Sequence, residues 1–146
     1  MHLAPSLKHA ELTEKIVGVF FSVYNELGHG FLECVYEQAV ELALAEAVIG
    51  VQRRVPIKVW FRGRRIGDFK ADMLVDEKVL LELKAARSID AAYEKQLLNY
   101  LRATDIEVGS LLNFGLRAEF RRFAFENRRK EIRVDQRECA AEKVSV

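Results

Sequence analysis

The chain has 146 residues, of which 50% are hydrophobic, and a formal net charge of +1 at pH 7. This length fits one domain, and the apolar fraction is sufficient for a core that needs no disulfide staples. The near-neutral charge does not mark a nucleic-acid binder by itself, because such domains usually carry a pronounced basic excess.

Targeting features are weak along the whole sequence. The first residues contain Pro5 and Lys8 but no long apolar stretch, which argues against a signal peptide, and no later run approaches membrane-spanning length. The two cysteines, Cys34 and Cys139, lie far apart, so we expect no disulfide framework. These features predict a cytoplasmic protein that does not associate with membranes.

Two amphipathic helices are expected first. Apolar residues recur at three- and four-residue steps from Glu11 to Leu27, and the glycine-rich segment 28–30 ends this pattern. A second helical pattern begins at Phe31 or Leu32 and runs to about Val48. The short loop between the patterns predicts a helix pair.

The hydrophobic period then changes to two, which is typical of strands. Residues 55–61 alternate between apolar and polar, and Gly63 supplies a turn into a second strand over residues 66–75. After a turn at residues 76–78, the segment 79–85 is almost entirely apolar. Such a run predicts a central strand that is covered on both faces.

The remaining elements complete an α/β order. Residues 90–103 predict a third helix, and residues 106–114 and 119–125 predict two further strands. An antiparallel meander followed by a helical crossover into a parallel strand indicates a mixed central sheet flanked by helices. We expect one domain over residues 1–126, and a charged tail over residues 127–146 that is frayed or partly helical.

Three charged residues stand out in the central hairpin. If a three-residue turn follows Val75, Asp72 faces Glu82 with their β-carbons about 5 Å apart. Two carboxylates in that position are unfavourable without a partner, and a hard divalent cation supplies one. Lys84, on the same face as Glu82, is placed to polarise a phosphate. The alternative is that Glu82 and Lys84 face solvent or pair with each other, and the apolar run around them argues against it.

Basic side chains are unevenly distributed. The clusters either contact phosphates or form ordinary solvated faces. They are Arg53–Arg54; Arg62, Arg64 and Arg65; Arg117, Arg121 and Arg122; and Arg128, Arg129 and Lys130.

Several ordered motifs resemble one known family, the GxxExxY proteins, a branch of the PD-(D/E)XK nuclease superfamily. The naming motif is Gly30-Phe31-Leu32-Glu33-Cys34-Val35-Tyr36, followed by Ala71-Asp72-Met73-Leu74-Val75, Glu82-Leu83-Lys84-Ala85, Gln96-Leu97-Leu98-Asn99-Tyr100-Leu101 and Leu111-Leu112-Asn113-Phe114-Gly115. The resemblance covers about residues 12–125. It implies a restriction-endonuclease-like αβββαβ core in which Asp72, Glu82 and the main-chain carbonyl of Leu83 hold Mg²⁺ or Mn²⁺.

The same resemblance implies roles for residues on two helices. Glu33 matches an acid that many members place beside the metal, and its alternative is a first-turn glutamate favoured by the helix dipole. Gln96 and Tyr100, on one helical face, resemble the glutamine–tyrosine motif of the exonuclease branch. Their alternative is a helix surface with a half-buried tyrosine. Tyr93 stands where relatives often carry histidine, so no histidine role is expected there.

The histidines offer no further metal set. His2, His9 and His29 do not have the spacing of ligands, so a zinc site is not expected.

The sequence therefore predicts a metal-dependent nuclease that hydrolyses phosphodiester bonds through a metal-activated water, with DNA favoured over RNA as the substrate. A second class is a catalytically silent nuclease-fold module that binds nucleic acid or a protein partner. A third is a metal-binding regulatory protein. A homo-oligomer or a protein partner is compatible with each of these three classes.

Overall fold

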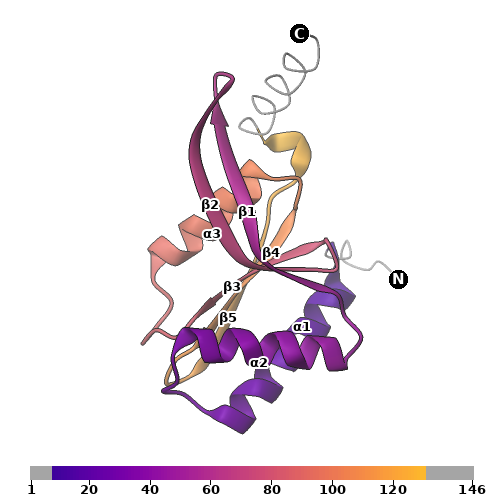
Figure 1. Cartoon of the computed structure of the whole chain (residues 1–146), viewed down its shortest axis with the longest axis vertical. Helices are drawn as coiled ribbons and strands as arrows, with labels where there is room; N and C mark the ends of the chain where they lie inside the picture. Colours follow the sequence, from indigo (N-terminus) through magenta and orange to yellow (C-terminus); the bar gives the residue numbers. More distant parts are fainter. Residues whose placement is uncertain (1–7, 131–146) are drawn as a thin grey trace, which may run out of the picture.

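A helix pair, a three-stranded meander, a crossover helix and two further strands follow one another along the chain (Figure 1). The computed structural model describes residues 8–130. The elements are α1 (Ala10–Leu27), α2 (Glu33–Glu46), β1 (Val51–Phe61), β2 (Arg64–Val75), β3 (Val79–Lys84), α3 (Ala91–Ala103), β4 (Val108–Phe114), β5 (Ala118–Ala124) and the short 3-10 helix η1 (Asn127–Arg129).

The five strands form one mixed sheet in the order β1-β2-β3-β4-β5. The first three strands are antiparallel neighbours, β4 joins β3 in parallel after the α3 crossover, and β5 returns antiparallel to β4. This arrangement confirms the expected α/β fold with a restriction-endonuclease-like mixed sheet.

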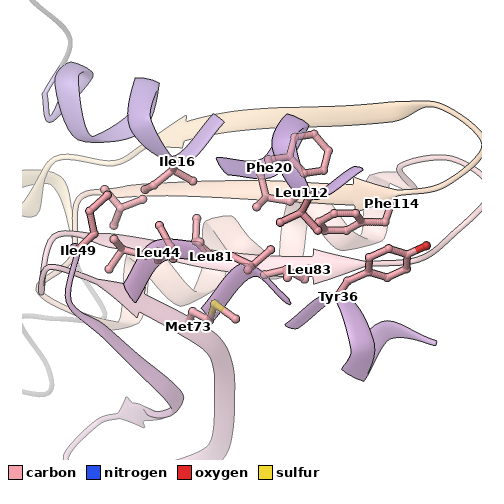
Figure 2. Packing of buried hydrophobic residues seen from close by; sticks show 14 of the residues in the cluster. Ile16, Phe20, Tyr36, Leu44, Ile49, Met73, Leu81, Leu83, Leu112 and Phe114 are labelled. Carbon is pink, nitrogen blue, oxygen red and sulfur yellow. The ribbon is translucent and has the colours of Figure 1, made fainter. Parts of the chain in front are cut away.

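Helices cover both faces of the sheet. The helices α1 and α2 pack on one face, where their apolar side chains meet those of β2, β3 and β4 (Figure 2). The helix α3 covers the other face through Leu97 and Leu101, against Leu80 and Leu111. Residues 79–83 of β3 are all buried, as expected for a strand covered on both sides.

Some element boundaries differ from the expected ones for local reasons. The helix α3 begins after Asp90, whose Oδ1 accepts a 2.7 Å hydrogen bond from the Ala92 N–H and so caps the helix. The helix α2 ends at Glu46, and Val48 has a φ of 58°, which takes the chain out of the helix. The strand β1 begins at Val51, four residues earlier than expected. The start was missed because polar side chains in residues 52–54 interrupt the apolar alternation.

The paired strands β1 and β2 continue beyond β3 as a twisted two-stranded arm (Figure 1). The β2–β3 ladder ends at Met73, whereas β1 and β2 stay paired to the hairpin turn. Met73 packs against α1 and α2, whereas Ala71, two residues earlier, packs on the α3 side. Alternate residues of a regular strand face the same side, so the paired strands twist between these two residues. Arg54, with a φ of 53°, lies in β1 at this point. Asp72 therefore stands where β2 leaves β3.

The end of the described chain packs on the domain. Lys130 is 1% exposed, and its Nζ donates hydrogen bonds to the carbonyls of Thr104 (3.0 Å) and Ile106 (2.6 Å). The expectation of a solvated or phosphate-binding cluster is therefore wrong for Lys130. The remainder of the expected tail, residues 131–146, lies outside the described residues.

Two further findings bear on the expectations from composition. Cys34 is a free, exposed thiol, and Cys139 lies outside the described residues. Within residues 8–130, none of the helices has the length and apolar character needed to cross a membrane.

Candidate active site

The strands β2 and β3 separate at Asp72, and two carboxylates close the gap. The Asp72 N–H donates a 3.0 Å hydrogen bond to Oε1 of Glu82, and the Leu83 N–H donates a 2.7 Å bond to Oδ2 of Asp72. Main-chain groups that the separating strands would leave unpaired are thereby satisfied. The expected register is confirmed by the Val75–Val79 pair, and it brings Asp72 and Glu82 together.

Burial makes both carboxyl groups weaker acids than they are in water. Glu82 is 4% exposed, and burial first, then the charge of Asp72, raise its pKa to about 8. Burial also raises the pKa of Asp72 to about 6, although the hydrogen bond from Leu83 opposes this shift. The negative charges of Glu37 and Glu33 raise the pKa of Asp72 further. Such a pair favours either a retained proton or a cation.

The first turns of α2 add two more carboxylates. Oxygen atoms of Glu33, Glu37 and Asp72 all lie within 4.8 Å of one another. Glu33 was predicted beside the metal, but Glu37 was missed. The available signal was spacing, since residues four apart in a helix share a face. The other carboxylate, Glu82, is linked to this group through the main chain of Asp72.

Three residues of the segment 30–36 explain how Glu33 is positioned. Gly30 has a φ of 109°, a conformation that favours glycine. The Tyr36 hydroxyl donates to the Gly28 carbonyl at 2.6 Å and accepts from the Phe31 N–H at 3.2 Å. Its ring stacks on Phe114 with centroids 4.3 Å apart. The tyrosine therefore fixes the loop that begins α2 to the core, as Figure 2 shows for Tyr36 and Phe114.

An arginine balances the charge of α2. Nη2 of Arg53 lies 3.0 Å from Glu37 Oε1, and its Nη1 lies 3.4 Å from Glu41 Oε1. Burial opposes the charge of Arg53, but bonds and charges from these glutamates outweigh it and raise its pKa. The expectation that Arg53 contacts phosphate or simply faces solvent is wrong, because its guanidinium is bound internally.

Lys84 lies on the same strand as Glu82 and is half-buried. Its Nζ lies 4.7 Å from the centroid of the Tyr93 ring, a distance typical of a cation–π contact. Its charge lowers the pKa of both Asp72 and Glu82, against the larger effect of burial. Tyr93, where a histidine was considered, thus contacts the ammonium of the lysine from α3.

The chain after Lys84 is fixed by Asn113, which belongs to a motif quoted above but was given no role there. Asn113 is fully buried, its Oδ1 accepts from the Ala86 N–H at 2.9 Å, and its Nδ2 donates to the Ala86 carbonyl at 3.0 Å. A Cβ on Gly115 would lie 2.2 Å from the same carbonyl oxygen. A polar residue inside an apolar strand was the signal for this anchor, because buried amides need partners.

The predicted pair on α3 lies beside the carboxylates and a groove. Tyr100 is 7% exposed, and burial followed by the charges of Glu82 and Asp72 raises its pKa to about 12. Gln96, one helical turn earlier, is half-buried and lines the adjoining groove with Tyr100. The role expected for the main-chain carbonyl of Leu83 stays a prediction.

The family model of the PD-(D/E)XK nuclease superfamily matches residues 10–123. The chain belongs to the PD-(D/E)XK nuclease superfamily. No curated protein matches this chain.

Two solved structures are similar to this chain at low sequence identity. The crystal structure of SSO0001 is 16% identical, with a TM-score of 0.54, over 94% of this chain and 69% of that chain. An alkaline exonuclease (LHK-Exo) from Laribacter hongkongensis is 13% identical, with a TM-score of 0.48, over 96% of this chain and 83% of that chain.

The donor set of this superfamily member fits a hard divalent cation. Carboxylate oxygens of Glu33, Glu37 and Asp72 converge, and Glu82 adds a buried carboxyl with a raised pKa. Oxygen donors of this kind suit Mg²⁺ or Mn²⁺. A cation here would compensate the charges that otherwise favour protonation.

Proposed function

We propose that the protein is a Mg²⁺- or Mn²⁺-dependent nuclease that hydrolyses phosphodiester bonds of DNA. The observation that carries this proposal is the meeting of Asp72 and Glu82 at the point where β2 leaves β3, beside the carboxylates of α2. Membership of the nuclease superfamily supports it. The roles of Gly30, Glu33 and Tyr36 also support the GxxExxY branch.

Asp72, Glu82, Glu33 and the Leu83 carbonyl are the proposed ligands. When bound, the cation would lower the pKa of a water and polarise a phosphate oxygen. Glu82 would hold the cation as a carboxylate, and because burial raises the pKa of Glu82 to about 8, its binding would be coupled to loss of the carboxyl proton. Its hydrogen bond from the Asp72 N–H keeps the side chain oriented.

Glu37 has a supporting role in this proposal. Its salt bridge to Arg53 holds it against β1. The carboxylate thereby fixes the side of α2 that presents Glu33, and it adds negative charge next to Asp72.

Lys84 is the proposed electrostatic partner of the substrate. Its ammonium stabilises negative charge that develops on the phosphate oxygens, and the Tyr93 ring contacts the same ammonium. Gln96 and Tyr100 orient the substrate or the lysine from α3.

The test is incubation of the full chain with labelled single-stranded, duplex and branched DNA and with RNA, in Mg²⁺, Mn²⁺ or EDTA. We expect cleavage of DNA only with a cation, and its loss in Glu82→Gln. Glu77→Gln, an exposed change in the β2–β3 turn, is the matched control. Cleavage that persists in EDTA or in Glu82→Gln contradicts the proposal. Binding of DNA without cleavage under every condition favours the silent module.

A further inference from the structure

A groove runs between the β1–β2 arm and α3. Its volume is about 580 Å³, and its lining includes Val59, Ile66, Phe69, Gln96 and Tyr100. Ligand pockets of roughly 300–1,000 Å³ take small molecules, so this groove has room for one unstacked nucleotide and not for a duplex.

The groove displays an aromatic surface. Phe69 is 48% exposed, Ile66 is 64% exposed, and the Phe69 ring lies 6.1 Å from that of Tyr100. The Phe69 ring also rests on Gly67, where an added Cβ would lie 2.7 Å from it. Exposed rings in a groove are the surfaces on which unpaired bases stack.

The basic side chains that line the groove come from α3 and are Lys95 and Arg102. The arm is also basic, because residues 55–70 contain five basic side chains and one acid, Asp68. Lys58 and Lys70 alternate with the groove-lining Val59 and Phe69 and therefore lie on the other face of the arm. Basic residues along a groove with aromatic rings typify single-strand binding sites.

The groove leads to the carboxylates. Tyr100 contacts Phe69 on one side, while the charges of Glu82 and Asp72 act on its phenol. A strand seated on Phe69 therefore continues toward the place where β2 leaves β3.

We propose that this groove binds an unpaired DNA strand, with a base stacked on Phe69 and its phosphates against Lys95 and Arg102 of α3. The inference rests on the proposed function, because it delivers a single strand to the same site. It assigns substrate binding to Phe69 and Gly67, which lie outside the carboxylate and lysine positions of the site.

Binding is measured in EDTA by fluorescence anisotropy of the full chain with labelled oligothymidylate, its duplex, and an abasic strand of equal length. We expect the normal strand to bind more tightly than the other two probes. Phe69→Ala should weaken its binding about tenfold, within the range for losing one stacked base. Phe69→Trp should restore it, and Gly67→Ala, which displaces the ring, should weaken it.

Phe61→Ala is the matched control, because Phe61 is also 48% exposed but lies near the arm tip under Arg62. Equal losses in Phe61→Ala and Phe69→Ala, or equal affinity for normal and abasic strands, overturn the inference. Light scattering tests a different occupant of the groove. If the wild type self-associates and Phe69→Ala abolishes this association, the inference is overturned and the groove is assigned to a second copy of the chain. Because the assay needs neither cation nor cleavage, its failure leaves the proposed nuclease activity to be judged separately.

Discussion

Oε1 of Glu82 accepts a 3.0 Å hydrogen bond from the main-chain N–H of Asp72. Asp72 in turn accepts from Leu83, so the two carboxylates close the main chain where the strands part. The same side chains thus have a structural and a proposed ligand role, and substitutions must be designed to separate them.

The first prediction concerns Asp72→Asn. The amide oxygen can still accept from the Leu83 N–H, while the charge that repels Glu33 and Glu37 is removed. We expect the variant to be at least as stable as the wild type in EDTA. A cation that binds only the folded state adds about 2.7 kcal/mol at a hundredfold excess over Kd, and the variant should lose most of this gain. Thermal melts in EDTA and a Mn²⁺ series measure both effects.

The opposite ranking would assign Asp72 a structural role. That outcome is a variant that melts well below the wild type in EDTA while both proteins respond equally to Mn²⁺.

The second prediction is a loss of metal-free stability as pH rises. Burial raises the pKa of Glu82 from an ordinary 4.5 to about 8, so the folded state keeps a proton that the unfolded state releases. The free energy of unfolding should therefore fall as the pH rises from about 4.5 to about 8. Asp72, whose pKa is raised to about 6, contributes to this fall below about pH 6. Urea unfolding in EDTA should show a flatter profile for Glu82→Gln. If the stability of the wild type and of Glu82→Gln had the same dependence on pH, Glu82 would have the same pKa in the folded and unfolded states.

The third prediction tests the charge balance of α2. Arg53→Met leaves the Glu37 carboxylate, whose side chain is 9% exposed, without its cation. Breaking a buried pair in this way costs roughly 3–5 kcal/mol, and we expect the lower end because Arg53 is partly exposed. Adding Glu37→Gln should recover most of the loss in urea unfolding. Additive losses in the double variant would mean that the two side chains are not coupled.

The fourth prediction separates charge from packing at Lys84. Lys84→Met keeps the apolar stem and removes the ammonium, so folding and Mn²⁺-dependent stabilisation should persist. We expect turnover to fall about a hundredfold or more, the range for loss of one electrostatic contact to a transition state. Steady-state cleavage kinetics measure this, with Lys78→Met in the exposed turn as the control. Unchanged turnover would leave Lys84 a structural residue.

The central hairpin was predictable because local rules determine it. A three-residue turn fixed the pairing of Val75 with Val79, and the two-residue period of a strand then placed Asp72, Glu82 and Lys84. The order of helices and strands followed from hydrophobic period in the same way.

Long-range polar contacts were not predictable from the same rules. Arg53 has the same sequence character as an exposed arginine, and only the folded chain shows that Glu37 of α2 binds it. The partner of Asn113 is the main chain of Ala86, which has no side-chain signature. The early start of β1 was missed for the same reason, since the ion-paired Arg53 interrupts its apolar pattern.

Because β2 separates from β3 at Asp72, the two hairpin turns differ in how well they tolerate insertions. The turn at the arm tip, where Arg62 and Gly63 both have positive φ, pairs only β1 with β2. An insertion there lengthens the arm and leaves the carboxylates in place. One residue added between Val75 and Val79 would shift β2 against β3 and turn Asp72 away from Glu82. The length of the arm can therefore change, and with it the outer end of the groove, without rebuilding the acidic site.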